Sequence, residues 1–138
     1  MKFMLRPACE EDKPFLQWLE KVCMRDYAVA LWGAWRPNSE EKIVLRDHRI
    51  VVNKGEDVGC VATIHSADDI WINRLYIAPS HQRHGLGAAV LRMVIAQATA
   101  LGLPVKVSVL TTNPAIAFYI REGLQVYEER SEHIFLTT

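Results

Sequence analysis

The chain has 138 residues, of which 16 are basic and 16 are acidic, so its formal net charge at pH 7 is zero. This length suits a single domain over residues 1–138 that buries about two-thirds of its unfolded surface. The neutral balance excludes a broad basic surface, so neither a nucleic-acid partner nor a membrane partner is expected.

Three scattered cysteines, Cys9, Cys23 and Cys60, form no Cys-x-x-Cys pair, which favours reduced, unreactive thiols over a disulfide framework or a metal site. Acidic residues follow the N-terminus before any apolar run of signal-peptide length. No segment approaches the roughly 20 apolar residues of a membrane span. The sequence therefore predicts a soluble, cytoplasmic protein.

The first third of the chain predicts one strand, one amphipathic helix and a less regular stretch. Lys2–Arg6 reads as a strand, and the acidic residues 10–12 suit the first turn of a helix. Trp18 is expected in the core as part of the apolar stripe of this helix. The stripe comprises Phe15, Leu16, Trp18, Leu19, Val22 and Cys23, and the polar face comprises Gln17, Glu20, Lys21 and Arg25.

Residues 27–38 could extend this helix, but Gly33 and Pro37 interrupt it. Ser39, followed by two glutamates, predicts the N-cap of a short helix to about Arg46. Beyond it the pattern changes to strands. Arg49–Val52 and Val58–His65 predict a hairpin around a glycine-bearing turn.

The remaining elements are predicted from alternation and helical spacing. Ile70–Ile77 and Val105–Leu110 read as strands, on either side of a helix that begins at Leu86. A shorter helix runs from Asn113-Pro114 to Gly123, and Leu124–Glu128 with His133–Leu136 predict a closing hairpin. The resulting order, β-α-α-β-β-β-α-β-α-β-β, predicts an α+β fold with a mixed α/β sheet flanked by helices.

The turn before the long helix reads Gln-Arg-His-Gly-Leu-Gly-Ala at residues 82–88. Its glycines leave backbone N–H groups uncovered at a helix N-terminus, where the helix dipole favours an anion, and Arg83 adds a nearby charge. Val90 stands where a dinucleotide-binding turn needs a third glycine, and no Gly-Lys-Ser/Thr of a Walker loop occurs. The turn therefore predicts a phosphate site outside those two nucleotide-binding classes.

Two motifs stand out in the second half of the chain. The first reads Leu75-Tyr76-Ile77-Ala78-Pro79-x-x-Gln82-Arg83-His84-Gly85-Leu86-Gly87, and the second reads Asn113-Pro114-Ala115-Ile116-Ala117-Phe118-Tyr119-x-x-x-Gly123-Leu124. Together they resemble the GNAT superfamily of acetyl-CoA-dependent N-acetyltransferases, and the first matches the family's Gln/Arg-x-x-Gly-x-Gly/Ala signature. Because the element order also agrees, the resemblance covers nearly the whole chain, and it is closest to short single-domain bacterial members.

The resemblance implies an acetyl-CoA site that begins at the glycine turn. Backbone N–H groups of this turn would bind the pyrophosphate, with Arg83 contributing a side-chain charge. Leu75, Tyr76 and Ile77 would pair through their backbone with the pantetheine arm, where the sheet splays away from the 105–110 strand. An N–H near Ile77 would polarise the thioester carbonyl. The residues implied at the pyrophosphate are Gln82, Arg83, His84, Gly85, Leu86, Gly87 and Ala88.

The second motif is implied to lie at the thiol end of the cofactor. Asn113 would contact the pantetheine arm, and Phe118 would also border the cofactor. Tyr119 would protonate the departing thiolate, because the pKa of a phenol, about 10, lies just above that of a thiol, about 8.5. No metal is implied.

The sequence departs from the family pattern at three places. Asn113 lies six residues before Tyr119, whereas many members place this asparagine seven residues before the tyrosine. In this chain Thr112 occupies the position seven residues before Tyr119. Leu124 replaces the usual phenylalanine. No acidic residue falls where some members keep a general base, and the candidates for that role are Asp68, Asp69, Asn73 acting through a water, His65 and His133.

The acceptor is left open by the sequence, as either a small-molecule amine or a protein amine. Trp32 and Trp35 flank Gly33 in the irregular stretch and are candidates for an aromatic wall of the acceptor pocket. A coenzyme A-binding sensor or interaction module without catalysis is the alternative reading, and transfer of a longer acyl group is a third. The closing hairpin could supply an edge for a homodimer.

Overall fold

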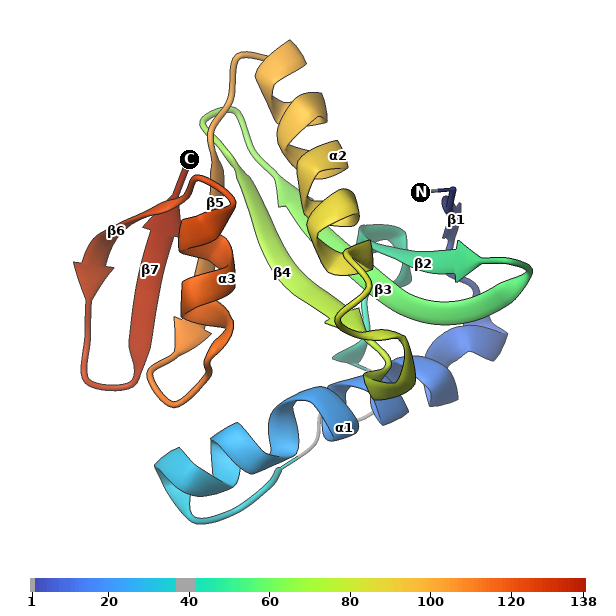
Figure 1. Ribbon diagram of the computed structural model, residues 1–138, viewed down its shortest axis with the longest axis horizontal. Coiled ribbons are helices and arrows are strands. Elements are labelled where there is room, and N and C mark those ends of the chain that lie inside the picture. Colours follow the sequence, from blue (N-terminus) through green and yellow to red (C-terminus); the bar gives the residue numbers. More distant parts are fainter. Residues whose placement is uncertain (1, 37–41) are drawn as a thin grey trace.

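In the computed structural model, which describes residues 2–36 and 42–138, a seven-stranded mixed sheet is packed against three α-helices (Figure 1). The strands lie in the order β1-β2-β3-β4-β5-β7-β6. They are β1 Met4–Pro7, β2 His48–Asn53, β3 Glu56–His65, β4 Ile70–Ile77, β5 Val105–Leu110, β6 Gln125–Glu129 and β7 His133–Thr137. The helices are α1 Lys13–Trp32, α2 Leu86–Ala100 and α3 Ala115–Arg121, with 3-10 turns η1 Glu10–Asp12, η3 Leu45–Asp47 and η4 Pro79–His81.

The predicted α+β fold is confirmed, and its second half agrees closely with the expectation. Both strands that flank the glycine turn and its helix, β4 and β5, have the predicted bounds, and α2 begins at Leu86 as expected. Strands β2, β3 and β4 form the predicted antiparallel set, and β6 with β7 forms the closing hairpin. Within the sheet, β7 lies between β5 and β6.

The undecided stretch after residue 27 continues α1 as far as Trp32. Gly33 then ends the helix with a φ of 78°, a left-handed conformation that glycine adopts without strain, and its N–H donates to the Val29 carbonyl at 2.8 Å. The predicted N-cap at Ser39 lies outside the described residues. An α-helix to about Arg46 was expected here, but residues 42–47 contain no α-helix, and Leu45–Asp47 form the 3-10 turn η3.

The predicted polarity of α1 is wrong at three positions. The side chain of Trp18 is 46% exposed and stacks on Phe15 at the surface, and Val22 of the predicted apolar stripe is 39% exposed. Glu20, expected on the polar face, is 8% exposed. Leu16, Leu19 and Glu20 share the buried side of the helix. A helix buries the narrow face that meets the sheet, and Trp18 lies outside that face because residues two apart on a helix point in nearly opposite directions.

The helices cover the two faces of the sheet unequally (Figure 1). The larger core cluster joins α2 and α3 to alternate residues of β3, β4 and β5, and it includes Val61 and Val94. The smaller cluster places Leu16 and Leu19 of α1 against Cys60, the neighbour of Val61. Because successive strand residues point to opposite faces, α1 lies on the face opposite to α2 and α3.

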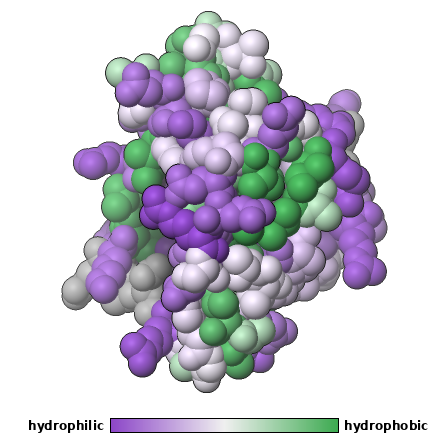
Figure 2. All heavy atoms as spheres, turned by 90° about the vertical axis from the view of Figure 1, so that its left-hand side faces the viewer, coloured by the Kyte–Doolittle hydropathy of each residue, from purple (hydrophilic) through white to green (hydrophobic). Residues whose placement is uncertain are grey.

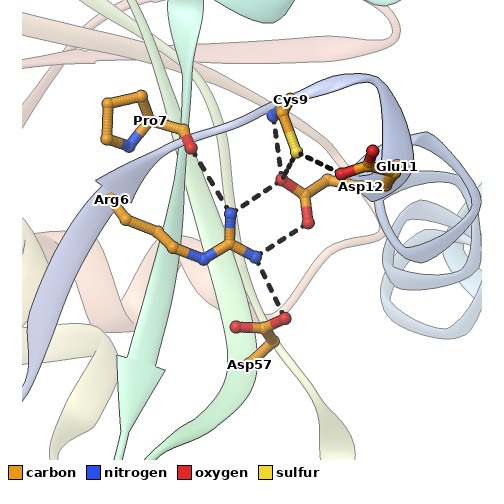
Figure 3. A network of polar contacts seen from close by, with 6 residues as sticks. All are labelled: Arg6, Pro7, Cys9, Glu11, Asp12 and Asp57. Atoms are coloured by element: carbon orange, nitrogen blue, oxygen red, sulfur yellow. Dashed lines mark hydrogen bonds and ion pairs between the residues drawn. The ribbon is translucent and has the colours of Figure 1, made fainter.

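An ion-paired network fixes the N-terminal strand to the start of α1 (Figure 3). The Arg6 guanidinium donates to both carboxylate oxygens of Asp12, at 2.8 and 2.9 Å, and to Asp57 at 3.0 Å. The Cys9 N–H also donates to Asp12, at 2.9 Å. These bonds join β1, the first turn of the helix and the β2–β3 hairpin.

Asp12 should make the stability of the protein depend on acidity. Hydrogen bonds from Arg6, assisted by the Cys9 N–H, lower the pKa of the Asp12 carboxyl from 3.8 to about 2. The stabilisation, about 2 kcal/mol, is therefore complete above the unfolded pKa and is lost as the pH falls from about 4 through about 2. When the free energy of unfolding is measured in urea, it should fall less between about pH 4 and pH 2 for Asp12→Asn than for the natural chain.

Asp57→Asn is the matched control, because the Asp57 side chain is 44% exposed and its pairing with Arg6 should contribute little. Its acid dependence should follow that of the natural chain. Identical slopes for the natural chain and Asp12→Asn would contradict the assignment.

Candidate functional site

A cleft of about 1030 Å³ opens where β4 and β5 separate. These two parallel strands are paired at only three positions, from Ile70↔Val105 to Ile72↔Val107. The rest of β4 and of β5 lines the cleft, with α1, the first turn of α2 and α3 around it. The sheet therefore splays at the place where the resemblance implied a cofactor.

A β-bulge in β4 accompanies this separation. Ile72 is paired with Thr63 and Arg74 with Ala62, so Asn73 is an extra residue opposite β3. A bulge bends its strand and reverses which face later side chains take. Beyond it, Leu75 contacts the α2-side core. Residues 73–77 consequently face the cleft with an edge that pairs with no residue of β5.

The turn into α2 presents unpaired backbone donors. Among the described residues, no backbone carbonyl accepts a hydrogen bond from the N–H groups of residues 83–88, and the helical ladder begins with Ala89 N–H to the Gly85 carbonyl at 3.0 Å. Arg83 and Gly85 have positive φ values, 66° and 79°. Left-handed residues at a helix N-terminus turn successive N–H groups toward one point, which is how backbone binds phosphate. This geometry suits an anion, and phosphate binding by this cradle of residues 82–88 stays a prediction.

The Gln82 side chain makes a hydrogen bond within the protein, and the implied role of Gln82 at the pyrophosphate stays a prediction. Its side-chain amide Nε2 donates to the Ile77 carbonyl at 2.8 Å, which ties the cradle to the end of β4. The Cys23 thiol of α1 donates to the same carbonyl at 3.4 Å. Three segments thus meet at Ile77.

Tyr119 of α3 borders the cleft with 5% of its surface exposed. Its ring meets Phe118 edge to face at 5.1 Å between centroids. Burial raises the pKa of the phenol above its usual value, so the hydroxyl is protonated at neutral pH. No hydrogen-bond partner for this hydroxyl occurs in the described parts of the chain, which leaves it free to donate to a ligand.

Asn113 also lines the cleft, and its side chain caps α3. Its Oδ1 accepts a hydrogen bond from the Ala115 N–H at 2.9 Å, and its Nδ2 lies 3.9 Å from the Met24 Sδ of α1. The neighbouring Thr112 hydroxyl donates to the Tyr27 carbonyl at 2.7 Å. This loop therefore fixes α1 over the cleft, and contact between Asn113 and the pantetheine arm stays a prediction.

Most of the remaining predicted site residues also line the cleft, and two do not. His84 is exposed outside the lining, and the Leu86 side chain is buried in the core, so that only its backbone N–H is available. The predicted residues in the lining are Asn73, Leu75, Tyr76, Ile77, Gln82, Arg83, Gly85, Gly87, Ala88, Asn113, Phe118 and Tyr119, with Trp32, Trp35 and His133.

The candidate general bases divide in the same way. Asn73 and His133 line the cleft, whereas His65 lies in a second depression of the surface. The Ser66 hydroxyl donates to Asp69 Oδ1 at 3.0 Å and accepts from the N–H groups of Asp68 and Asp69. Both aspartates thus belong to the turn before β4.

A buried ion pair at the cleft was missed by the sequence reasoning. Arg74 of β4 and Glu20 of α1 are each 8% exposed, and their side chains meet at 2.8 Å. Glu20 follows Leu16 by four residues and precedes Cys23 by three, so helical spacing places it on the side that contacts the sheet. That spacing was the signal that could have identified it.

Burial makes the two inner cysteines poor nucleophiles. It raises the pKa of Cys23 to about 11 and that of Cys60 to about 12, so both thiols are protonated at neutral pH. All three cysteines are free. In the described part of the chain, no group of three or more His, Cys, Asp or Glu side chains could hold a metal ion, and no helix is long and apolar enough to span a membrane.

Three comparisons relate this chain to known proteins. A search of curated protein sequences found no match. Solved structures with the same fold include PaiA N-acetyltransferase from Thermoplasma acidophilum in complex with coenzyme A, with a TM-score of 0.82, 15% identity, and coverage of 100% of this chain and 99% of that one. An acetyltransferase from Thermus thermophilus has a TM-score of 0.77 and 22% identity, with 100% and 97% coverage.

The Escherichia coli ribosomal-protein-S18-alanine N-acetyltransferase has a TM-score of 0.76 and 19% identity, with coverage of 99% of this chain and 92% of that one. At these identities the likeness shows a shared fold. Residues 40–125, more than half of the chain, match the sequence profile of the family described as Acetyltransferase (GNAT) domain. The chain therefore belongs to the GNAT family of N-acetyltransferases.

Proposed function

We propose that this chain transfers an acetyl group from acetyl-CoA to a primary amine by direct attack, with both substrates bound together. The observation that carries the proposal is a single cleft with a cradle of unpaired N–H groups at one end and the free Tyr119 hydroxyl in its wall. We also propose that the chain acts as one domain in the cytoplasm.

The donor would bind largely through backbone. The N–H groups of residues 83–88 would hold the pyrophosphate, with the Arg83 side chain beside them. Residues 73–77 offer an unpaired strand edge, to which the amides of the pantetheine arm can add as a further strand would. The Ile77 N–H is the donor we assign to the thioester oxygen, whose negative charge grows during attack.

The reaction needs two proton transfers. The amine nitrogen bonds to the thioester carbon, the carbon–sulfur bond breaks, and the thiolate takes the proton of the Tyr119 hydroxyl. The attacking amine gives its proton to a water that Asn73 holds and that passes the proton to solvent, or to His133; these two predicted candidates line the cleft. Because the Cys23 thiol is protonated, direct attack is favoured over an acyl-cysteine intermediate. Positioning of the two substrates would supply much of the acceleration.

The acceptor would enter beside the C-terminal end of α1. Trp32 and Trp35 line this end of the cleft, and the Trp32 indole N–H donates to Glu132 at 2.9 Å. The ring centroids of Trp32 and His133 lie 6.5 Å apart. A fixed aromatic wall of this kind suits either a small-molecule amine or a protein amine.

A homodimer through the closing hairpin is part of the proposal. Strand β6 is an edge of the sheet, and Val126 and Tyr127 on it are 39% and 44% exposed. Figure 2 looks onto this end of the molecule and shows apolar patches on either side of a hydrophilic band. Open backbone groups beside apolar side chains allow a second copy to pair there.

The proposed reaction is tested by assaying acetyl transfer with a panel of amines that includes amino acids, polyamines and peptides with free N-termini. Transfer to at least one amine is expected. Coenzyme A binding without transfer to any of them would favour a sensor over an enzyme.

Replacing Tyr119 by Phe should lower kcat by about 10²- to 10⁴-fold, because the thiolate would lose its proton donor. Coenzyme A affinity in calorimetry should stay within about twofold, because the ring and its packing are kept. Unchanged kcat in the variant would remove Tyr119 from the mechanism.

Replacing Gly87 by Glu should weaken coenzyme A binding by about 10- to 100-fold, because a carboxylate would lie beside the pyrophosphate at the helix N-terminus. Gly87→Ala is the matched control. A Cβ at this position would lie 3.8 Å from Ile77 and 3.9 Å from Phe118, at ordinary contact distance, so its affinity should be close to the natural one. Equal losses in both variants would point to packing and against an anion site.

A further inference from the structure

Gly59 of β3 lies directly against the end of β4, where it is paired with Ile77. A Cβ added to Gly59 would lie 2.4 Å from the backbone oxygen of Tyr76, 2.8 Å from Ile77 Cδ1 and 3.2 Å from Ile77 Cα. The first of these distances is far inside van der Waals contact, and a backbone carbonyl has no rotamer by which to move away. Any side chain at residue 59 must therefore displace the end of β4.

Ile77 transmits such a displacement to the cradle. Its side chain is 7% exposed and lies between β3 and the first turn of α2, where a Cβ on Gly87 would be 3.8 Å from Ile77 Cγ1. Gly59 and Gly87 therefore both lie against the side chain of Ile77. Because Gly59 has no side chain, Ile77 can pack close to β3. The position of the Ile77 side chain in turn determines how closely α2 can approach β4.

The backbone at this point cannot absorb the change locally. The Ile77 carbonyl accepts hydrogen bonds from Gln82 of the cradle at 2.8 Å and from Cys23 of α1 at 3.4 Å. The Ala78 N–H donates to the Val58 carbonyl of β3 at 2.8 Å. The end of β4 is thus held from three sides, and its movement would also move the cradle or break these bonds.

We propose that Gly59 is a positioning residue, which sets the spacing between the phosphate cradle and the unpaired edge of β4. The proposal rests on the proposed function, in which one donor molecule binds to both. A ligand that touches only the cradle is insensitive to this spacing, whereas a ligand that spans the cradle and the strand depends on it.

The test compares two ligands on the natural chain and on Gly59→Ala by calorimetry or competition. Coenzyme A spans both parts, and 3′-phospho-ADP carries its phosphates without the pantetheine arm. In Gly59→Ala, coenzyme A should bind about tenfold more weakly, while 3′-phospho-ADP should stay within about twofold. A merely structural role would lower both affinities together or neither.

Gly55→Ala is the matched control from the same hairpin. Gly55 has a φ of 80°, and nothing lies within 4 Å of its added Cβ, so this change strains the turn without touching the cleft. It should lower the melting temperature and leave both affinities unchanged. If Gly59→Ala does not fold, Ile77→Ala removes the side chain against which Gly59 and Gly87 both lie and should produce the same selective loss.

The possible failures are distinguishable. If the natural chain does not bind coenzyme A, the proposed function fails. If it does bind, equal affinities of Gly59→Ala and the natural chain for coenzyme A, or equal losses for the two ligands, would overturn the positioning role.

Discussion

The short pairing between β4 and β5 is the constraint on which the rest of the molecule depends. After three paired positions the bulge at Asn73 bends β4, and the two strands diverge around a cleft. A parallel sheet normally satisfies its backbone groups strand by strand, so an unpaired edge inside a fold leaves donors and acceptors available for a ligand. In this protein, the interrupted ladder leaves such an edge on β4.

One side of the cleft offers mainly backbone groups, and the other side offers mainly side chains. On the side where we propose that the donor binds, the groups available to a ligand are mainly backbone: the open edge of β4 and the N–H groups before α2. On the other side, α1 contributes side chains and is attached through them, by the Glu20–Arg74 ion pair and the hydrogen bond from Trp32 to Glu132. Proteins that share a fold can carry different functions, because the side chains of the site can differ between them.

This division explains how much could be predicted from the sequence. The strand Ile70–Ile77, the glycine turn and the start of α2 at Leu86 have strong local signals, because glycine positions and apolar spacing act over a few residues. The burial of Glu20 follows from its helical spacing to Leu16 and Cys23, whereas the exposure of Trp18 depends on how α1 lies across the sheet, and no local pattern contains that angle. The bulge at Asn73 depends equally on its distant partner strand β3.

The same reasoning indicates where differences in acceptor should arise. The cradle and the edge of β4 are joined through Ile77, so most changes there would disturb donor binding whatever the acceptor. The C-terminal end of α1 is held by hydrogen bonds that involve side chains, from Thr112 to the Tyr27 carbonyl and from Trp32 to Glu132. Under the proposed function, substitutions near Trp32 and Trp35 should therefore reshape the acceptor side while the donor side is preserved, and we expect this end of α1 to distinguish one amine from another.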